Sequence, residues 1–160
     1  MTDLSTMENL KGSVKAMTVL FYALFAGVII FLLIILGLLQ LQIKFLEGGD
    51  IGKILLIIVL LIAVICLVSA VSIYNKRVNE IANSTLSLTE KLNSYRATLI
   101  LYLALSEGPA MFSIICLLLT GNYWCMAVTA GMLIAMLFKK PSRQKLIDEL
   151  QLDWQDQGQL

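Results

Sequence analysis

The sequence contains no histidine and few charged residues. Only 14% of its 160 residues are charged, compared with roughly 25% in a typical soluble domain, whereas 59% are hydrophobic. The missing histidine removes the commonest metal ligand and general base from the chain. The formal net charge of +1 provides no strongly basic surface, so we expect no nucleic-acid partner.

Cysteine is also scarce, and no pattern of nucleophile and base is present. Cys66, Cys116 and Cys125 lie in or beside apolar runs without C-x-x-C or other ligand spacing. We therefore expect each of them to act as a small buried hydrophobe. The apolar runs contain no paired carboxylates, no Ser/Lys pair and no phosphate-binding loop. This pattern predicts no enzymatic activity, no catalytic residue, no metal site and no cofactor.

Four apolar runs have the composition of membrane-spanning helices, which need about 20 apolar residues. They are Met17–Leu39, Ile54–Ile73, Ala97–Leu119 and the shorter Tyr123–Phe138. We expect an all-α membrane protein with four transmembrane helices. The lipid bilayer is then the first partner of the chain.

The segments between these runs predict how the helices begin and end. Helical spacing continues after the second run as far as Ala82, and Ser87-Leu88-Thr89-Glu90 is a capping-box pattern that predicts the start of the next helix. Thr120-Gly121-Asn122 predicts a tight turn between the last two runs, and Leu41–Lys53 a longer exposed turn. The ends of the chain carry weak amphipathic stripes, at Leu4, Met7, Leu10 and Val14 and at Leu146, Ile147 and Leu150, which we expect to lie on the membrane surface or fray.

Basic residues indicate the orientation in the membrane. Ten of the twelve lie on one side of the predicted spans, and only Lys44 and Lys53 lie on the other. The positive-inside rule therefore predicts that both termini are cytoplasmic, in what we expect to be a bacterial inner membrane. The predicted organisation is a cytoplasmic N-terminal segment (1–16), a helical hairpin with a cytoplasmic extension (17–82), a second hairpin (83–140) and a cytoplasmic tail (141–160).

The two predicted hairpins resemble each other at an offset of 81 residues. Ala23, Gly27 and Phe31 correspond to Ala104, Gly108 and Phe112, with further Leu and Ile matches between them. This agreement predicts two tandem hairpins related by a parallel repeat. Small residues at four-residue spacing let membrane helices approach closely. We expect such packing, within the chain or between chains, at Ala23, Gly27, Ala104, Gly108, Ala127, Gly131 and Ala135.

Glu107 is the one charged residue in the run Ala97–Thr120. It lies ten residues after Ala97, about 15 Å along a helix. A carboxylate at that depth is costly, and this makes it a functional-site hypothesis. Pro109 leaves the carbonyl of Leu105 without its helical donor, so a carboxyl group, the Ser106 hydroxyl and a free carbonyl are expected within one turn.

The segment 104–115, which reads ALSEGPAMFSII, resembles the ion-binding helix of the proteolipid, subunit c, of rotary ATPases. The resemblance covers these dozen residues. It implies that Glu107 corresponds to the carboxylate that binds a proton or sodium ion, and that Ser106 corresponds to the neighbouring hydroxyl. Larger members of that family also have four spans from a duplicated hairpin and one carboxylate lost, which implies ion transport by an oligomer.

Three interpretations of Glu107 follow from the sequence. Glu107, Ser106 and Leu105 form a proteolipid-like proton or sodium site. Alternatively, the protein is a non-catalytic membrane subunit, and Glu107 pairs with a homo-oligomer neighbour or another membrane subunit. In the third interpretation, Glu107 is a neutral packing residue beside Pro109.

Overall fold

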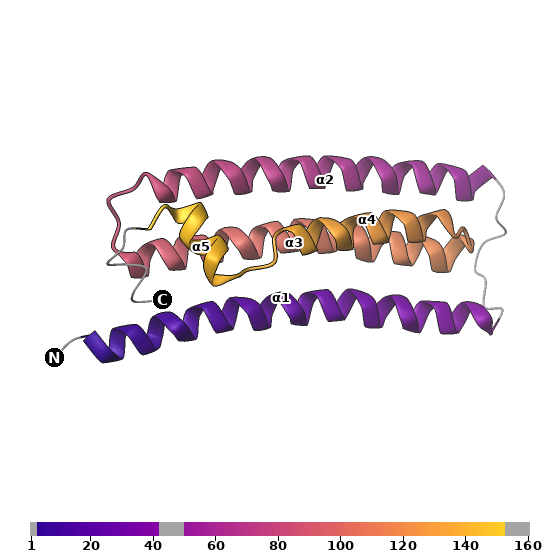
Figure 1. The fold of residues 1–160 in the computed structure, drawn as a ribbon. Helices are drawn as coiled ribbons and strands as arrows, with labels where there is room; N and C mark the ends of the chain where they lie inside the picture. Colours follow the sequence, from indigo (N-terminus) through magenta and orange to yellow (C-terminus); the bar gives the residue numbers. More distant parts are fainter. Residues whose placement is uncertain (1–2, 42–49, 153–160) are drawn as a thin grey trace.

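The computed structural model describes residues 3–41 and 50–152, with residues 3–11 and 13 described by their backbone alone. The described chain forms five helices and no strand: α1 Asp3–Gln40, α2 Asp50–Ala82, α3 Leu88–Thr120, α4 Trp124–Phe138 and α5 Arg143–Leu150 (Figure 1). The expectation of an all-α protein is confirmed for these residues. Of the predicted turn Leu41–Lys53, residues 42–49 lie outside the described part, and Asp50–Lys53 already belong to α2, so the expected turn ends before Asp50. The side chains of the N-terminal stripe before Val14 and the last eight residues also lie outside the described part.

The helix ends follow the local sequence signals. At the start of α3, Glu90 accepts hydrogen bonds from the Ser87 backbone nitrogen at 3.0 Å and from the Ser87 hydroxyl at 2.8 Å. At its end, Gly121 has a φ of 64°, and its N–H donates to the Leu117 carbonyl at 2.8 Å. Glycine adopts that left-handed conformation without the steric cost that a Cβ brings. The predicted capping box and the tight turn before α4 are therefore both confirmed.

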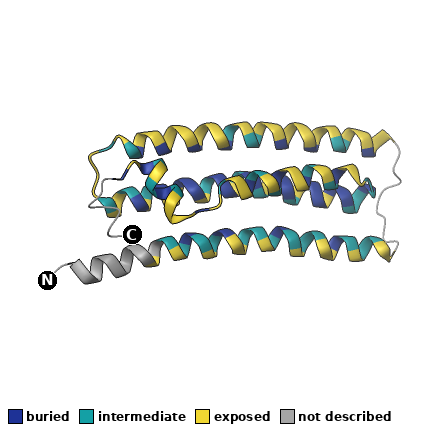
Figure 2. Ribbon diagram, viewed as in Figure 1, coloured by how far each residue is buried: buried dark blue, intermediate teal, exposed yellow. Residues whose placement is uncertain are grey.

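Helix α3 is the centre of the bundle. It contacts α1, α2 and α4 extensively, whereas α1 packs much more on α3 than on α2. In Figure 1, α1 and α2 accordingly lie on opposite sides of the α3–α4 pair. In the most apolar 18-residue stretch of α3, half of the residues are buried, whereas the corresponding share is 17% in α1 and in α2. Figure 2 shows the same difference between the exposed α2 and the buried α3.

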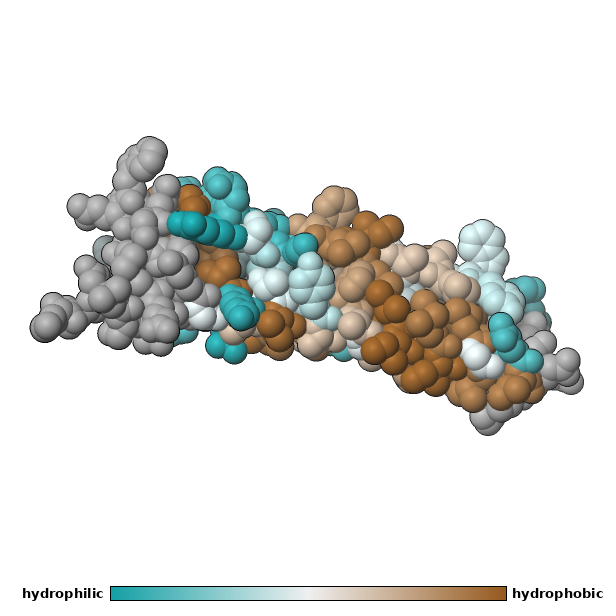
Figure 3. Space-filling model, turned by 60° about the horizontal axis from the view of Figure 1, so that its bottom comes forward, coloured by the Kyte–Doolittle hydropathy of each residue, from teal (hydrophilic) through white to brown (hydrophobic). Residues whose placement is uncertain are grey.

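Three helices are long and apolar enough to cross a membrane. They are α2, α3 and the part of α1 over Val14–Gln40. Helix α4 has 15 residues, about 22 Å at the usual rise, against a hydrocarbon core about 30 Å thick. Exposed Ile, Leu and Val side chains cover much of α2. Figure 3 shows another face of the molecule. Its surface is mainly hydrophobic over the half that lies towards the α3–α4 turn. This surface is compatible with a membrane protein.

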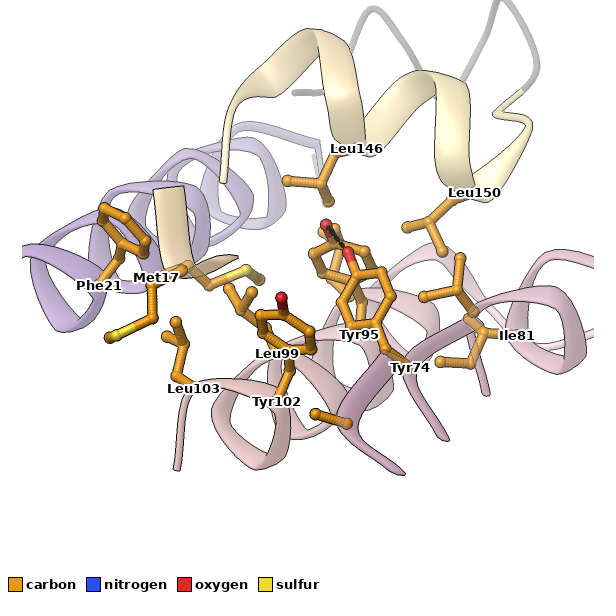
Figure 4. Packing of buried hydrophobic residues seen from close by; sticks show 14 of the residues in the cluster. Met17, Phe21, Tyr74, Ile81, Tyr95, Leu99, Tyr102, Leu103, Leu146 and Leu150 are labelled. Atoms are coloured by element: carbon orange, nitrogen blue, oxygen red, sulfur yellow. Dashed lines mark hydrogen bonds between the residues drawn. The ribbon is translucent and has the colours of Figure 1, made fainter. Parts of the chain in front are cut away.

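The short helix α5 packs against the bundle, so the expectation that this segment lies on the membrane surface or frays is wrong. Leu146 and Leu150 are fully buried, and Leu152 is 6% exposed. These side chains join a core with Met17, Tyr74 and Tyr95 among others (Figure 4). Burying three leucines in this way contributes several kcal/mol, at about 1.5–3 kcal/mol for each fully buried side chain.

We predict that Leu146→Ala loosens α5. Removing a buried leucine side chain costs about 2–5 kcal/mol, because the transfer free energy is lost and a cavity remains. The full-length variant in detergent should be cleaved by trypsin after Arg143 and Lys145 much faster than the wild type. Gln144→Ala, at an exposed position of the same helix, is the matched control and should be cleaved at the wild-type rate. Equal cleavage of both variants would show that α5 is not held by this leucine.

Candidate functional site

Glu107 lies at the margin of the buried face of α3. Leu103 and Ala110, about one turn away on either side, are fully buried, whereas Ala104 and Gly108 are exposed and Glu107 itself is half-buried. Within the described residues its carboxylate has no hydrogen bond and no charged partner. The structure therefore places an unpaired carboxyl group where the packed interior of the chain meets its outer surface.

The hydroxyl group of Ser106 does not join Glu107. Ser106 is fully buried, and its Oγ donates a hydrogen bond to the Tyr102 carbonyl at 3.0 Å. Successive residues of a helix point about 100° apart, so the side chains of Ser106 and Glu107 face different directions. No described side chain donates to the carbonyl of Leu105. The three groups that the sequence places within one turn are not brought together as a coordination site in this chain.

The small residues expected at helix contacts are open on the surface of this chain. Ala23, Ala104, Gly108, Ala127 and Gly131 are exposed, and Gly27 and Ala135 are half-buried. A Cβ atom built on Gly27, Gly108 or Gly131 would meet nothing within 4 Å. The expectation of close packing at these glycines is therefore wrong within the described chain, and packing between chains stays a prediction.

Two apolar grooves run beside α2 where small residues leave space. One, with a volume of about 260 Å³, is lined by Ile62, Cys66, Ala104, Leu105, Gly108, Pro109 and Phe112. The other, of about 320 Å³, is lined by Leu60, Ala63, Val64, Leu67, Ala127, Val128, Gly131 and Met132. Gly108 thus borders a groove while its neighbour Glu107 lies at the edge of the buried face.

Hydroxyl groups cross-link α3 to α4. The Tyr102 hydroxyl donates to the Ala135 carbonyl at 2.9 Å, and the Ser113 hydroxyl donates to the Cys125 carbonyl at 2.7 Å. The carbonyl that Ser113 reaches lies in the first turn of α4, whereas the Thr129 hydroxyl donates to the same Cys125 carbonyl within its own helix, at 3.2 Å. The polar side chains of the α3–α4 contact are therefore used for packing.

A second polar cluster, the Glu149 network, joins α5 to α2, α3 and the end of α4. The Glu149 carboxylate accepts hydrogen bonds from the hydroxyls of Tyr74 at 2.5 Å and Tyr95 at 2.8 Å. These two hydroxyls lie 2.8 Å apart (Figure 4). The Lys139 ammonium lies 3.7 Å from the carboxylate and 4.0 Å from the centre of the Tyr74 ring. The network consists of Tyr74, Tyr95, Lys139 and Glu149.

The sequence did not single out the Glu149 network, although a partial signal was present. Tyr95 lies on the same stripe as Leu88, Leu92 and Leu99, which indicates an inward position without naming a partner. Lys145, one turn before Glu149, donates to the Phe138 carbonyl at 2.5 Å. Burial lowers the pKa of Lys145, Glu149 opposes that shift, and the nearby Lys139 adds to it. The charges around α5 are therefore set by its docking on the bundle.

Comparisons with known protein families, with curated proteins and with solved structures give no match for this chain.

We predict that Glu149→Gln weakens the docking of α5. The substitution removes the ion pair with Lys139 and the charge from two hydrogen bonds, and hydrogen bonds to charged groups contribute about 1.5–3 kcal/mol. The melting temperature of the full chain in detergent should fall, with Asp148→Asn at the exposed neighbouring acid as the control. In a double-mutant cycle with Tyr95→Phe, the two effects should not add. Additive effects would mean that Tyr95 and Glu149 do not interact.

Proposed function

We propose that this chain is a non-catalytic subunit of a membrane assembly in which Glu107 of α3 meets a polar or basic group of a partner helix. The partner is a second copy of the chain or another membrane subunit. The unpaired carboxyl group carries the proposal. Every fully buried side-chain oxygen or nitrogen among the described residues has a hydrogen-bond partner, whereas Glu107, at the protein's outer surface, has none.

The energetic argument is that a carboxyl group at this depth needs a partner. Glu107 lies 13 residues before the end of α3 at Thr120, about 20 Å along the helix. An acid at the centre of a spanning helix costs about 2.5–3.5 kcal/mol or more, and such acids pair with another polar group. Since residues 3–41 and 50–152, as far as they are described, offer Glu107 no donor, we expect a neighbouring chain to supply one within the bilayer.

The surface beside Glu107 suits a helix that approaches closely. Ala104 and Gly108 are exposed on the same helix and border the groove beside α2. Membrane helices associate through such small residues because their backbones can then come into contact. A side chain from a partner helix would fill the groove while the same helix brings its polar group to Glu107.

The proposed topology has four spans, with both termini in the cytoplasm of a bacterial cell. The end of α2, the start of α3 and the end of α4 lie at one end of the bundle in Figure 1, and the basic residues there are Lys76, Arg77, Lys91, Arg96, Lys139 and Lys140. Helix α4 would cross with the exposed Tyr123 and Trp124 at one interface and the lysines at the other.

The tandem repeat is part of the same proposal. Helices α1 and α3 run in the same direction, as do α2 and α4 (Figure 1), which a duplicated pair of helices requires. Helix α1 packs on α3 instead of on α2. The two proposed repeats would therefore share their sequence pattern and the direction of their helices, but the first pair would not pack as a hairpin of its own. Ala26 stands at the position of α1 that corresponds to Glu107, so one copy carries the carboxyl group.

A proteolipid-like proton or sodium site is the second candidate function, and it is supported by the local resemblance of residues 104–115. Several features fit it less well than they fit an assembly subunit. The Ser106 hydroxyl is engaged with Tyr102. Glu107 is on the first helix of its pair, whereas the family places its carboxylate on the second, and the proposed orientation of the termini is opposite to the family's usual one.

The assembly function is tested by Glu107→Leu and Gly108→Leu in the full-length protein. Loss of a polar contact between membrane helices costs about 0.6–2 kcal/mol, so we expect association in membranes to weaken by about threefold to thirtyfold. Chemical cross-linking in native membranes, followed by light scattering in mild detergent, measures the assembled fraction. Gly37→Leu makes the same change at an exposed glycine of α1 that also has open space around it, and should assemble like the wild type.

Two outcomes would contradict this function. One is a wild-type chain that is monomeric in native membranes, and the other is an unchanged assembly in both variants. A third arm separates the ion site from the assembly. Labelling of Glu107 by a hydrophobic carbodiimide that sodium ions prevent, combined with intact assembly of Glu107→Gln, would favour the ion site.

A further inference from the structure

Two of the three cysteines lie in contact at the turn between α3 and α4. Cys116 is in the last turns of α3 and is 2% exposed, and Cys125 is in the first turn of α4 and is fully buried. Their sulfur atoms lie 3.3 Å apart, with the Cys125 thiol donating to the Cys116 sulfur. The third cysteine, Cys66, lies on α2 and is half-buried.

Hydrogen bonds around the turn hold the two sulfur atoms close together. The Ser113 hydroxyl binds the carbonyl of Cys125 itself, at 2.7 Å, which fixes the first turn of α4 against α3. The Thr120 hydroxyl accepts from the Asn122 N–H at 3.2 Å, and the Asn122 side chain accepts from the Trp124 N–H at 3.1 Å. The approach of the two cysteines is therefore supported by hydrogen bonds on both sides of the turn.

The geometry allows a covalent bond with little movement. A disulfide has a sulfur–sulfur distance of about 2.0 Å and requires neighbouring Cβ atoms. The two sulfur atoms must move together by about 1.3 Å to reach that length. Side-chain rotation can supply a movement of that size. Cys125 directly follows the exposed Trp124, so the opening of one helical turn gives a small reagent access to it.

We propose that Cys116 and Cys125 are a redox pair that closes to an intramolecular disulfide by exchange with a small organic disulfide. The thiolate of one cysteine attacks the reagent, forms a mixed disulfide and releases one reagent thiol. The thiolate of the other cysteine then attacks the protein sulfur of that mixed disulfide and releases the second reagent thiol. Two protein thiols are oxidised and one reagent disulfide is reduced to two thiols, so atoms and electrons balance.

This redox pair is independent of the assembly function. It shares no residue with the Glu107 surface and does not depend on whether Glu107 has a partner. In the proposed topology the α3–α4 turn faces the non-cytoplasmic side, where disulfides form and persist. The reaction itself can be measured on isolated membranes whichever side the turn faces.

The test uses the full-length Cys66→Ser chain in native membranes, treated with the membrane-permeant reagent 4,4′-dithiodipyridine. Free thiols are then blocked with N-ethylmaleimide before the protein is unfolded and analysed by mass spectrometry. We expect a product that has lost two hydrogens, carries no pyridyl group and regains two thiols on reduction. In the Cys116→Ser, Cys66→Ser chain, the remaining Cys125 should keep a stable pyridyl adduct.

A disulfide found before any reagent is added, or one formed on treatment, supports the redox pair. Two unmodified thiols after treatment would overturn it, as would a pyridyl adduct retained on each cysteine of the Cys66→Ser chain. If the two cysteines form only a hydrogen-bonded packing contact, both thiols should stay unmodified after treatment. Because Cys66 lines the groove beside Glu107, the assembled fraction is measured by cross-linking on the untreated wild-type chain, where it reports on the Glu107 surface separately.

Discussion

The burial of α3 among α1, α2 and α4 is the constraint on which the rest of the structure depends. In a bilayer, helices gain little from hydrophobic burial against one another, because lipid tails are as apolar as leucine. The contact between α3 and α4 combines close packing of their buried side chains with hydrogen bonds from Tyr102 and Ser113 to carbonyl groups of α4. The same central helix contributes Tyr95 to the Glu149 network, so the docking of α5 also depends on it.

Glu107 differs from the buried polar side chains of α3. The polar side chains on the buried face of the helix are satisfied, through bonds to the helix itself or to α4 and α5. The carboxyl group stands just outside that face, next to exposed small residues, and no described residue pairs with it. A carboxyl group that the described part of the fold leaves unpaired at this depth would be stabilised by a polar group from outside the chain, which is why we favour assembly over internal packing.

Much of the fold could be predicted from the sequence because its signals are local. Apolar runs fix the helices, Ser87 and Glu90 mark the start of α3, and Gly121 marks its end. The docking of α5 could not be predicted in this way, since an amphipathic stripe at Leu146 and Leu150 suits a membrane surface as well as a protein core. Cys116 and Cys125 are nine residues apart, and only the geometry of the turn brings their sulfur atoms together.

The candidate site was predicted less well than the fold. Glu107 could be identified as a charge within an apolar run, but the direction of Ser106 depends on which face of α3 is buried, and the sequence of so apolar a helix does not show that face. The four-residue spacing of the small residues is visible in the sequence, but the sequence does not show which helix, if any, covers them. Gly108 proves to be open within the chain, and that openness could be learned only from the packing of α2 beside α3.

Photo-cross-linking from position 112 in living cells tests most directly whether a partner helix covers the surface beside Glu107. Phe112 is exposed and lines the same groove as Gly108, so a photoreactive phenylalanine derivative can replace it without filling the glycine position. The same derivative at Gly37 of α1 is the control. We expect a specific protein adduct from position 112, reduced when Glu107 is changed to Leu, and none from position 37. Adducts to lipid alone from both positions would contradict this expectation.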